Sequence, residues 1–132
     1  MSELVQIGDF RENGYQTVVK FGGWRAAYLN NTSEKPSDIT YLERHVESDE
    51  LFVLVEGSCK LILSSTGFTE PEIVEMEPLV MYNVRQTAYH AVQMQPGCRI
   101  LIVENHDVSK ENTLYYYLTE EEKTALTDML SK

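Results

Sequence analysis

The chain has 132 residues, which is enough for one domain with its own core and too few for two. Eleven Lys and Arg against twenty-one Asp and Glu give a formal net charge of −10, which opposes general binding to nucleic acid or to an anionic membrane. No stretch approaches the roughly 18 consecutive apolar residues of a membrane span. Glu3 and Asp9 interrupt residues 1–10, so a secretory signal is not expected there and a cytoplasmic protein is predicted.

Two β-strands separated by a glycine turn are predicted near the start of the chain. Residues 15–21 contain three consecutive β-branched residues, Gly22 and Gly23 interrupt the pattern, and residues 24–29 form the second strand. Residues 30–38 are rich in Asn, Ser, Pro and Thr and are predicted to be a loop. This loop precedes the most informative stretch of the chain, so it is either a flap over a site there or a plain surface connection.

The next two strands carry the first candidate metal ligands. Residues 39–45 alternate in polarity as a strand does, which puts Glu43 and His45 on one face. A turn follows, and the next strand begins at Glu50, which shares its face with Phe52. Imidazole and carboxylate groups that converge from neighbouring strands offer the fixed nitrogen and oxygen donors that a borderline divalent metal needs.

Short strands continue through most of the remaining chain. A second histidine, His90, opens a strand on which Val92 shares its face. The two cysteines, Cys59 and Cys98, lie in apolar strand patterns without CxxC spacing and are expected to be reduced core residues. Even spacing and turn signals favour an antiparallel barrel or sandwich. The further predicted strands are residues 59–63, 72–77, 79–84, 90–95, 98–103 and 113–118.

A helix is predicted at the end of the chain. Thr119 and Glu122 have the spacing of a capping box at its start. A narrow apolar stripe follows, and because so short a helix is not stable alone, the stripe must pack on the strands of its own chain or on a second subunit. The stripe consists of Ala125, Leu126, Met129 and Leu130.

The stretch from residue 43 to residue 94 resembles the cupin superfamily of small β-barrels. The first cupin motif is G-x5-H-x-H-x3–4-E-x6-G, and this chain matches it with His45, four intervening residues, Glu50, six intervening residues and Gly57. The second motif is G-x5-P-x-G-x2-H-x3-N, and His90 falls at its histidine. The resemblance implies an all-β, RmlC-like, double-stranded β-helix (jelly-roll) barrel in a single domain, residues 1–132. The barrel core would span about 15–118 and a short C-terminal α-helix about 119–131.

The chain departs from both motifs at several positions. Glu43 stands where the family has its first metal histidine, and Leu79 stands at the leading glycine of the second motif. Arg85 and Thr87 replace that motif's proline and second glycine, and Met94 replaces its asparagine. The remaining set resembles the two-histidine, one-carboxylate facial arrangement, which suits iron or manganese and also accepts zinc or nickel.

The resemblance makes His45, Glu50 and His90 the predicted ligands of one divalent metal (Mn, Fe, Zn or Ni), with Glu43 as an optional fourth ligand. The alternatives are that both histidines are ordinary half-buried residues and that Glu43 is neutralised by a tyrosine or by Arg85. Arg85 itself either meets a carboxylate or phosphate of a ligand or is an exposed rim arginine. The predicted ligand-binding residues are Tyr41, Phe52, Tyr82, Arg85 and Val92.

Two functions from different classes remain open. One is a metal-dependent cupin enzyme acting on a small polar molecule, and the other is a non-catalytic binding or sensing cupin without a functional metal site. The fold hosts isomerases, oxygenases, decarboxylases and binding proteins, so the resemblance does not select a reaction. Because small cupins often pair, it also implies a homodimer.

Overall fold

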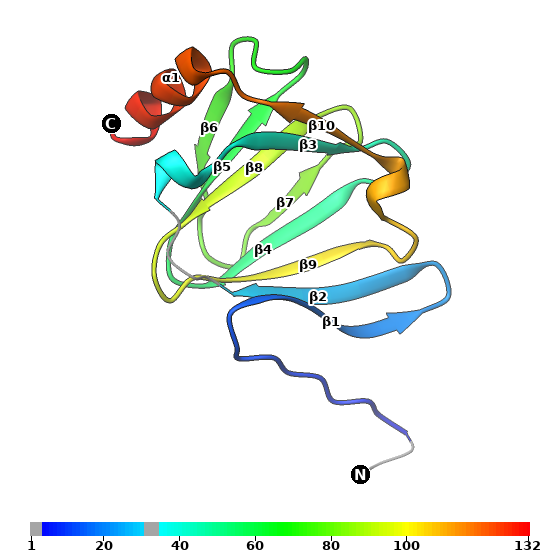
Figure 1. Ribbon diagram of the computed structural model, residues 1–132. Helices are drawn as coiled ribbons and strands as arrows, with labels where there is room; N and C mark the ends of the chain where they lie inside the picture. The colour runs from blue at the N-terminus through cyan, green and yellow to red at the C-terminus, as the bar shows by residue number, and fades with distance from the viewer. Residues whose placement is uncertain (1–3, 31–34) are drawn as a thin grey trace.

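The computed structural model describes residues 4–30 and 35–132, and the strands in these residues form two five-stranded antiparallel sheets (Figure 1). The first sheet has the order β1 (Gly14–Phe21), β2 (Trp24–Asn30), β9 (Arg99–Asn105), β4 (Glu50–Glu56) and β7 (Met81–Val84). The second has the order β10 (Thr113–Tyr117), β3 (Tyr41–His45), β8 (Tyr89–Met94), β5 (Cys59–Ser64) and β6 (Glu72–Glu75). Two 3₁₀ turns, η1 (Pro36–Asp38) and η2 (Lys110–Asn112), and one helix, α1 (Glu120–Leu130), complete the described elements. The predicted all-β architecture with a short C-terminal helix is therefore confirmed.

The core lies between the two sheets. Most of its buried side chains come from β4 and β9 of the first sheet and from β5 and β8 of the second, as period-two alternation requires of strands with one inward face. Each large apolar side chain buried there contributes roughly 1.5–3 kcal/mol. Cys59 and Cys98 are both buried in this core as reduced cysteines, as predicted. The other buried members are Phe52, Leu54, Leu61, Met76, Val84, Met94, Ile100 and Ile102.

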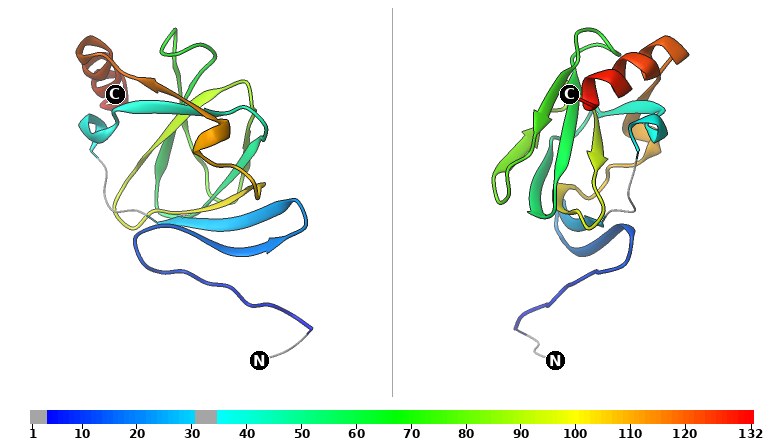
Figure 2. Two further views of the ribbon diagram at one scale, coloured as in Figure 1. Left: turned by 45° about the vertical axis from the view of Figure 1, so that its right-hand side comes forward. Right: turned by 90° about the vertical axis from the view of Figure 1, so that its left-hand side faces the viewer.

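Helix α1 packs on its own chain, at the outer face of the second sheet and beside η1 (Figure 2). Leu126 and Leu130 are buried against Leu42 of β3 and Ile62 of β5. The predicted capping box is present, because the Thr119 hydroxyl accepts from the Glu122 amide at 3.1 Å and the Glu122 carboxylate accepts from the Thr119 amide at 2.9 Å. Of the predicted stripe, Met129 is half-buried and Ala125 is exposed, so the packing face is narrower than expected.

Two strands, β3 and β7, begin two residues later than the sequence predicts. β3 begins at Tyr41, because the backbone N–H of Ile39 bonds to the Pro36 carbonyl and closes the η1 turn. β7 begins at Met81, because Leu79 has a φ of +66°, in the left-handed region that L-residues rarely adopt. The loop predicted at residues 30–38 as a flap or a surface connection includes residues 31–34, which lie outside the described residues.

Gly57 at the end of the first motif is required by its surroundings. Its φ is +84°, and a Cβ atom there would lie 2.7 Å from the Cα of Cys98. Only glycine therefore allows the β4–β5 turn to approach the turn that precedes β9. Among the described residues, no helix is both long and apolar enough to cross a membrane.

Candidate metal centre

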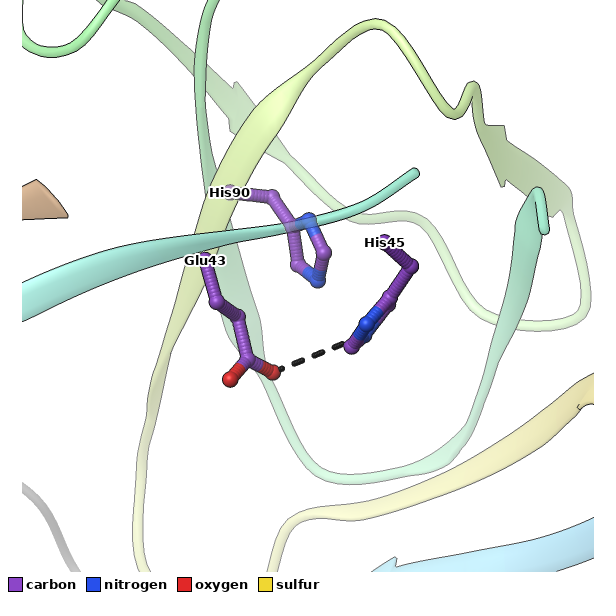
Figure 3. Close-up of side chains that lie close together, drawn as sticks. All are labelled: Glu43, His45 and His90. Atoms are coloured by element: carbon purple, nitrogen blue, oxygen red, sulfur yellow. Dashed lines mark ion pairs between the residues drawn. The ribbon is translucent and has the colours of Figure 1, made fainter. Parts of the chain in front are cut away.

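Five ionisable side chains meet between the two sheets. In the second sheet, β3 carries Glu43 and His45, and β8 carries His90 opposite Glu43. In the first sheet, Glu50 at the start of β4 pairs directly with Glu104 on β9. Figure 3 shows the side chains of Glu43, His45 and His90 turned toward one another. The shared face of Glu43 and His45 that alternation predicts is thus the face that lines this centre.

The carboxylate of Glu50 lies between the two imidazoles. Its Oε1 atom is 3.1 Å from Nε2 of His45 and 3.0 Å from Nε2 of His90. Two ligands bound to one ion at about 2.1 Å in a right-angled arrangement lie about 3 Å apart, so these separations are those of neighbouring ligands. Oε1 is fully buried, and neither ring directs an N–H at it with hydrogen-bond geometry. The carboxylate thus has an unsatisfied acceptor at the position that an ion would fill.

The orientation of the His45 ring is fixed by a hydrogen bond between its Nδ1 atom and Thr113. Nδ1 of His45 lies 2.9 Å from the Thr113 hydroxyl, which itself donates to the carbonyl of Ser109 at 2.7 Å. Because the hydroxyl has one hydrogen, it accepts from Nδ1, so we infer that Nδ1 carries a proton. Nε2 is left to hold either a second proton or a metal ion, as in metal sites where a partner fixes the imidazole tautomer.

The pKa values of the centre follow from burial and from mutual contacts. Burial opposes ionisation of Glu50, but the imidazoles of His45 and His90 outweigh it and its pKa falls to about 2. Burial lowers the pKa of His45, but Glu50, with smaller contributions from Glu43 and Glu104, more than offsets this and the pKa is raised above 6.5. In the absence of an ion, the raised pKa favours the imidazolium form of His45, whose positive charge opposes that of Glu50.

Glu104 belongs to the centre although it is not among the predicted site residues. Its Oε1 accepts from the Arg25 guanidinium, at 2.8 Å from Nη2 and 3.2 Å from Nε, and from the Tyr15 hydroxyl at 3.1 Å. Its Oε2 is buried and accepts no hydrogen bond from the described residues. Burial, followed by the charge of Glu50, raises the pKa of Glu104. Counting by two from the buried Ile100 and Ile102 along β9 would have placed Glu104 on the inner face.

The centre opens into a cavity of about 550 Å³. Three of the predicted ligand-binding residues, Tyr41, Phe52 and Val92, line it. Tyr82 does not, because its ring packs against the core and its hydroxyl accepts from the Glu77 amide at 2.9 Å. Arg85 does not either, because its side chain is 71% exposed and its Nε lies 3.1 Å from Oδ2 of Asp49.

Arg85 therefore has a different partner from the one considered in the sequence analysis. It pairs with Asp49 in the β3–β4 turn and not with Glu43. Asp49 also accepts from the backbone N–H of Gln86 at 2.9 Å and from the amide of Asn83 at 3.1 Å, so it ties its turn to the end of β7. The backbone N–H of Gln86, the largest contribution, holds the pKa of Asp49 below its usual value, with Asn83 and Arg85 acting in the same direction.

The structure is similar to several solved structures, although no protein-family model matches the sequence and neither does any curated protein. A cupin-2 domain protein from Shewanella frigidimarina aligns with a TM-score of 0.55 at 17% identity, over 74% of this chain and 85% of that one. The 3,4-ketoisomerase QdtA from Thermoanaerobacterium thermosaccharolyticum in complex with TDP aligns with a TM-score of 0.58 at 16% identity, over 80% and 74%. The Fe(II) form of HppE aligns with a TM-score of 0.56 at 17% identity over 69% of this chain, which spans only 49% of HppE. The chain has the cupin fold.

Within the cupin fold, two departures from the motifs become interpretable. Leu79 stands at the leading glycine of the second motif and keeps a left-handed backbone there, so the turn is retained although the glycine is not. Glu43 stands at the first metal histidine, and its Oε1 lies 3.6 Å from Nε2 of His45. The side chain of Glu43 is 33% exposed, whereas that of Glu50 is 8% exposed, so Glu43 is on the open side of the centre.

Tyrosines of β3 and β10 lie at the cavity and beside it. β10 pairs with β3 so that Tyr115 lies opposite Glu43 and Tyr117 lies opposite Tyr41. The Tyr41 ring centroid is 5.5 Å from that of Tyr115 and 5.6 Å from that of Tyr117. Tyr115 and Thr113 line the cavity and share one face of β10, as alternation along residues 113–118 would have indicated. The mouth is therefore aromatic, and the interior is acidic and imidazole-rich.

Proposed function

We propose that this protein is a cupin that binds one divalent metal ion through His45, Glu50 and His90, with Glu43 as an optional fourth ligand, and that a small polar molecule enters the cavity to reach the ion. The observation that supports the proposal is the Glu50 Oε1 atom, buried at ligand-to-ligand distance from both Nε2 atoms and without a directed hydrogen bond. The proposal places the ion inside a jelly-roll barrel formed by closure of the two sheets.

The charge of the cavity favours a cation. The carboxylates of Glu43, Glu50 and Glu104 face one guanidinium, that of Arg25, so two negative charges are uncompensated when both histidines are neutral. One divalent ion balances them. At the rim, Asp38 and Lys110 offset each other. A nucleoside diphosphate such as the TDP named for QdtA would meet carboxylates here, so we propose a small polar ligand without phosphate groups.

The residue types favour a hard ion. Exchange of the family's first histidine for Glu43 adds an oxygen donor with a negative charge, which favours manganese or iron over zinc or nickel. When bound, such an ion supplies Lewis acidity or a site for oxygen. The chain itself would hold the ion through His45, Glu50 and His90, and the apolar side chains of Phe52 and Val92 line the cavity beside it.

The second candidate is a non-catalytic binding or sensing cupin without a functional metal site. It is favoured by the raised pKa of His45, because an imidazolium at this position balances Glu50 with no ion present. In that case the tyrosines at the mouth and the cavity itself bind the small molecule, and the charged cluster serves only to maintain the fold.

Metal analysis separates the two functions. The protein is produced with manganese, iron, zinc and nickel supplied, and the bound metal is measured for the parent, for the His45→Ala/His90→Ala double variant and for His106→Ala. His106 is exposed and outside the cavity, so its variant is a matched control. We expect about one equivalent of metal in the parent and the control and nearly none in the double variant. A metal-free parent, or a double variant that retains the parent stoichiometry, supports the binding module instead.

A further inference from the structure

One oxygen of the Glu104 carboxylate, Oε2, is buried and accepts no hydrogen bond from the described residues. We propose that Glu104, through Oε2, is a ligand of the same ion that His45 and Glu50 bind, and that Glu43 is not. The inference rests on the proposed metal-binding function and changes its ligand set. It makes the centre one with two buried carboxylates from adjacent strands of the first sheet.

The strand register brings Glu104 to the ion site. Glu104 on β9 pairs directly with Glu50 on β4, so both side chains leave the same face of the first sheet side by side. Ligand atoms of His45, Glu50 and Glu104 all lie within 4.8 Å of one another, and all three residues are buried. An ion bound by this set would link the two sheets, because Glu50 and Glu104 come from the first sheet and His45 comes from β3 of the second.

The contacts of Glu104 fix the direction of its free oxygen. Arg25 and Tyr15 together place three donors on Oε1, at 2.8, 3.1 and 3.2 Å, and none on Oε2. The side chain is 3% exposed and lines the cavity, so bulk water does not satisfy Oε2. A buried carboxylate oxygen without a donor is costly, and such an atom in a native fold is commonly explained by an ion or an ordered water.

Arg25 is the one guanidinium that contacts either of the two carboxylates, Glu50 or Glu104, in the part of the chain that the structure describes. Arg25 neutralises one carboxylate, but Glu50 and Glu104 are both buried and repel each other across the strand pair. A divalent cation between them removes this repulsion and satisfies Glu50 Oε1 and Glu104 Oε2 together. These are two of the three buried side-chain atoms without a hydrogen-bond partner among the described residues.

Glu43 also has a ligand atom within 4.8 Å of those of His45 and His90, but it differs from Glu104 in its burial. It is on the solvent side of the centre with a third of its side chain exposed, and water can therefore satisfy its oxygens. It can approach the ion only with loss of that hydration, whereas Glu104 is already desolvated and oriented. Glu43 is then free to contact the small molecule that enters past Tyr115.

The test compares two single variants, Glu104→Gln and Glu43→Gln, by calorimetric titration of the metal-free proteins with Mn²⁺ alone. Glu104→Gln keeps an oxygen for Arg25 and Tyr15 and replaces the proposed ligand atom with an amide. We expect its Mn²⁺ affinity to fall by at least about tenfold, and that of Glu43→Gln to stay within about threefold of the parent. Far-ultraviolet circular dichroism checks that both variants fold.

A second measurement does not depend on the folding of Glu104→Gln. Protein labelled with ¹³C at the glutamate carboxyl groups is loaded with Mn²⁺, and electron–nuclear double resonance counts the strongly coupled carboxyl carbons. We expect two in the parent and two in Glu43→Gln. One in the parent, a loss of one in Glu43→Gln, or an unchanged affinity in a folded Glu104→Gln variant overturns the proposal for Glu104 while the metal site stands. A parent that binds no Mn²⁺ and carries no other metal overturns the proposed function and this inference together.

Discussion

At the scale of single residues, Glu50 and His45 determine what the centre does as the pH changes. Glu50 is ionised across the physiological range because its pKa is lowered to about 2. His45 is the group that changes, because its pKa is raised above 6.5 by the carboxylates around it. A metal ion on Nε2 must displace the proton that Glu50 otherwise stabilises there, so proton binding and metal binding compete at one atom.

Metal affinity should therefore depend on pH. As the pH falls through the raised pKa of His45, the imidazole takes up a proton and the apparent affinity for Mn²⁺ should fall, with the loss beginning above about 6.5. Competition with a chelator of known affinity, repeated between about pH 8 and pH 5.5, measures this. In the His106→Ala control the profile should be unchanged, and a pH-independent affinity in the parent would mean that His45 is not a ligand.

At the scale of elements, the turn before β7 retains a conformation that its residue does not favour. Leu79 has a φ of +66° and is 75% exposed, so its side chain gains little from burial that would offset the backbone strain. The turn is kept because the Leu79 amide donates to the Leu54 carbonyl at 2.9 Å, which attaches it to β4. Met81, two residues later, is equally exposed at 74% but has an ordinary negative φ.

Replacement of Leu79 by glycine should leave stability unchanged or increase it. Relief of the left-handed strain, about 1–2 kcal/mol, offsets the entropy cost of glycine, about 0.5–1 kcal/mol. The matched control Met81→Gly has no strain to relieve and should lower the free energy of unfolding by about 0.5–1 kcal/mol. Urea unfolding measures both. Equal destabilisation of the two variants would contradict a strained backbone at Leu79.

Helix α1 and strand β3 are held together by buried apolar side chains. Leu42 on the outer face of β3 contacts the helix cluster, while Glu43 and His45 face the cavity. Leu126→Ala should lower the free energy of unfolding by about 2–5 kcal/mol, because Leu126 is completely buried in that cluster. Ala125→Ser at the exposed neighbouring position should change it little. Guanidinium unfolding measures both variants, and a loss below about 1 kcal/mol for Leu126→Ala would mean that α1 does not dock as described.

At the scale of the whole molecule, local periodicity predicts the strands but not their neighbours. Alternation along residues 39–45 predicts that Glu43 and His45 share a face, because the two faces of a strand follow from the sequence of that strand alone. Alternation along β9 also puts Glu104 on the inner face, but its position beside Glu50 depends on the pairing of β9 with β4, which is a long-range contact. Tyr82 and Arg85 are predicted ligand-binding residues, but the contacts of Tyr82 with Glu77 and of Arg85 with Asp49 hold them outside the cavity lining.

Assembly is also a property of the whole molecule, and we predict a homodimer. Leu126 and Leu130 of α1 are already covered by their own chain, so we place the pairing surface on the strands. Large apolar side chains are exposed around the β1–β2 hairpin, with Phe21 at 77% and Trp24 at 44%, and Leu4 and Ile7 are exposed in the extended segment before it. Exposed apolar groups that gather in this way are typical of protein–protein contacts.

Light scattering at micromolar concentration should give about twice the 15.2 kDa mass of one chain. Phe21→Glu should shift the mass toward one chain, because a carboxylate would be buried without a partner in the interface. Tyr117→Glu, an equally drastic change at an exposed position of the second sheet, should leave the dimer intact. A monomeric parent would refute the dimer. A dimeric parent that Tyr117→Glu dissociates and Phe21→Glu does not would move the interface to the second sheet, where it would close the mouth that the small molecule must use.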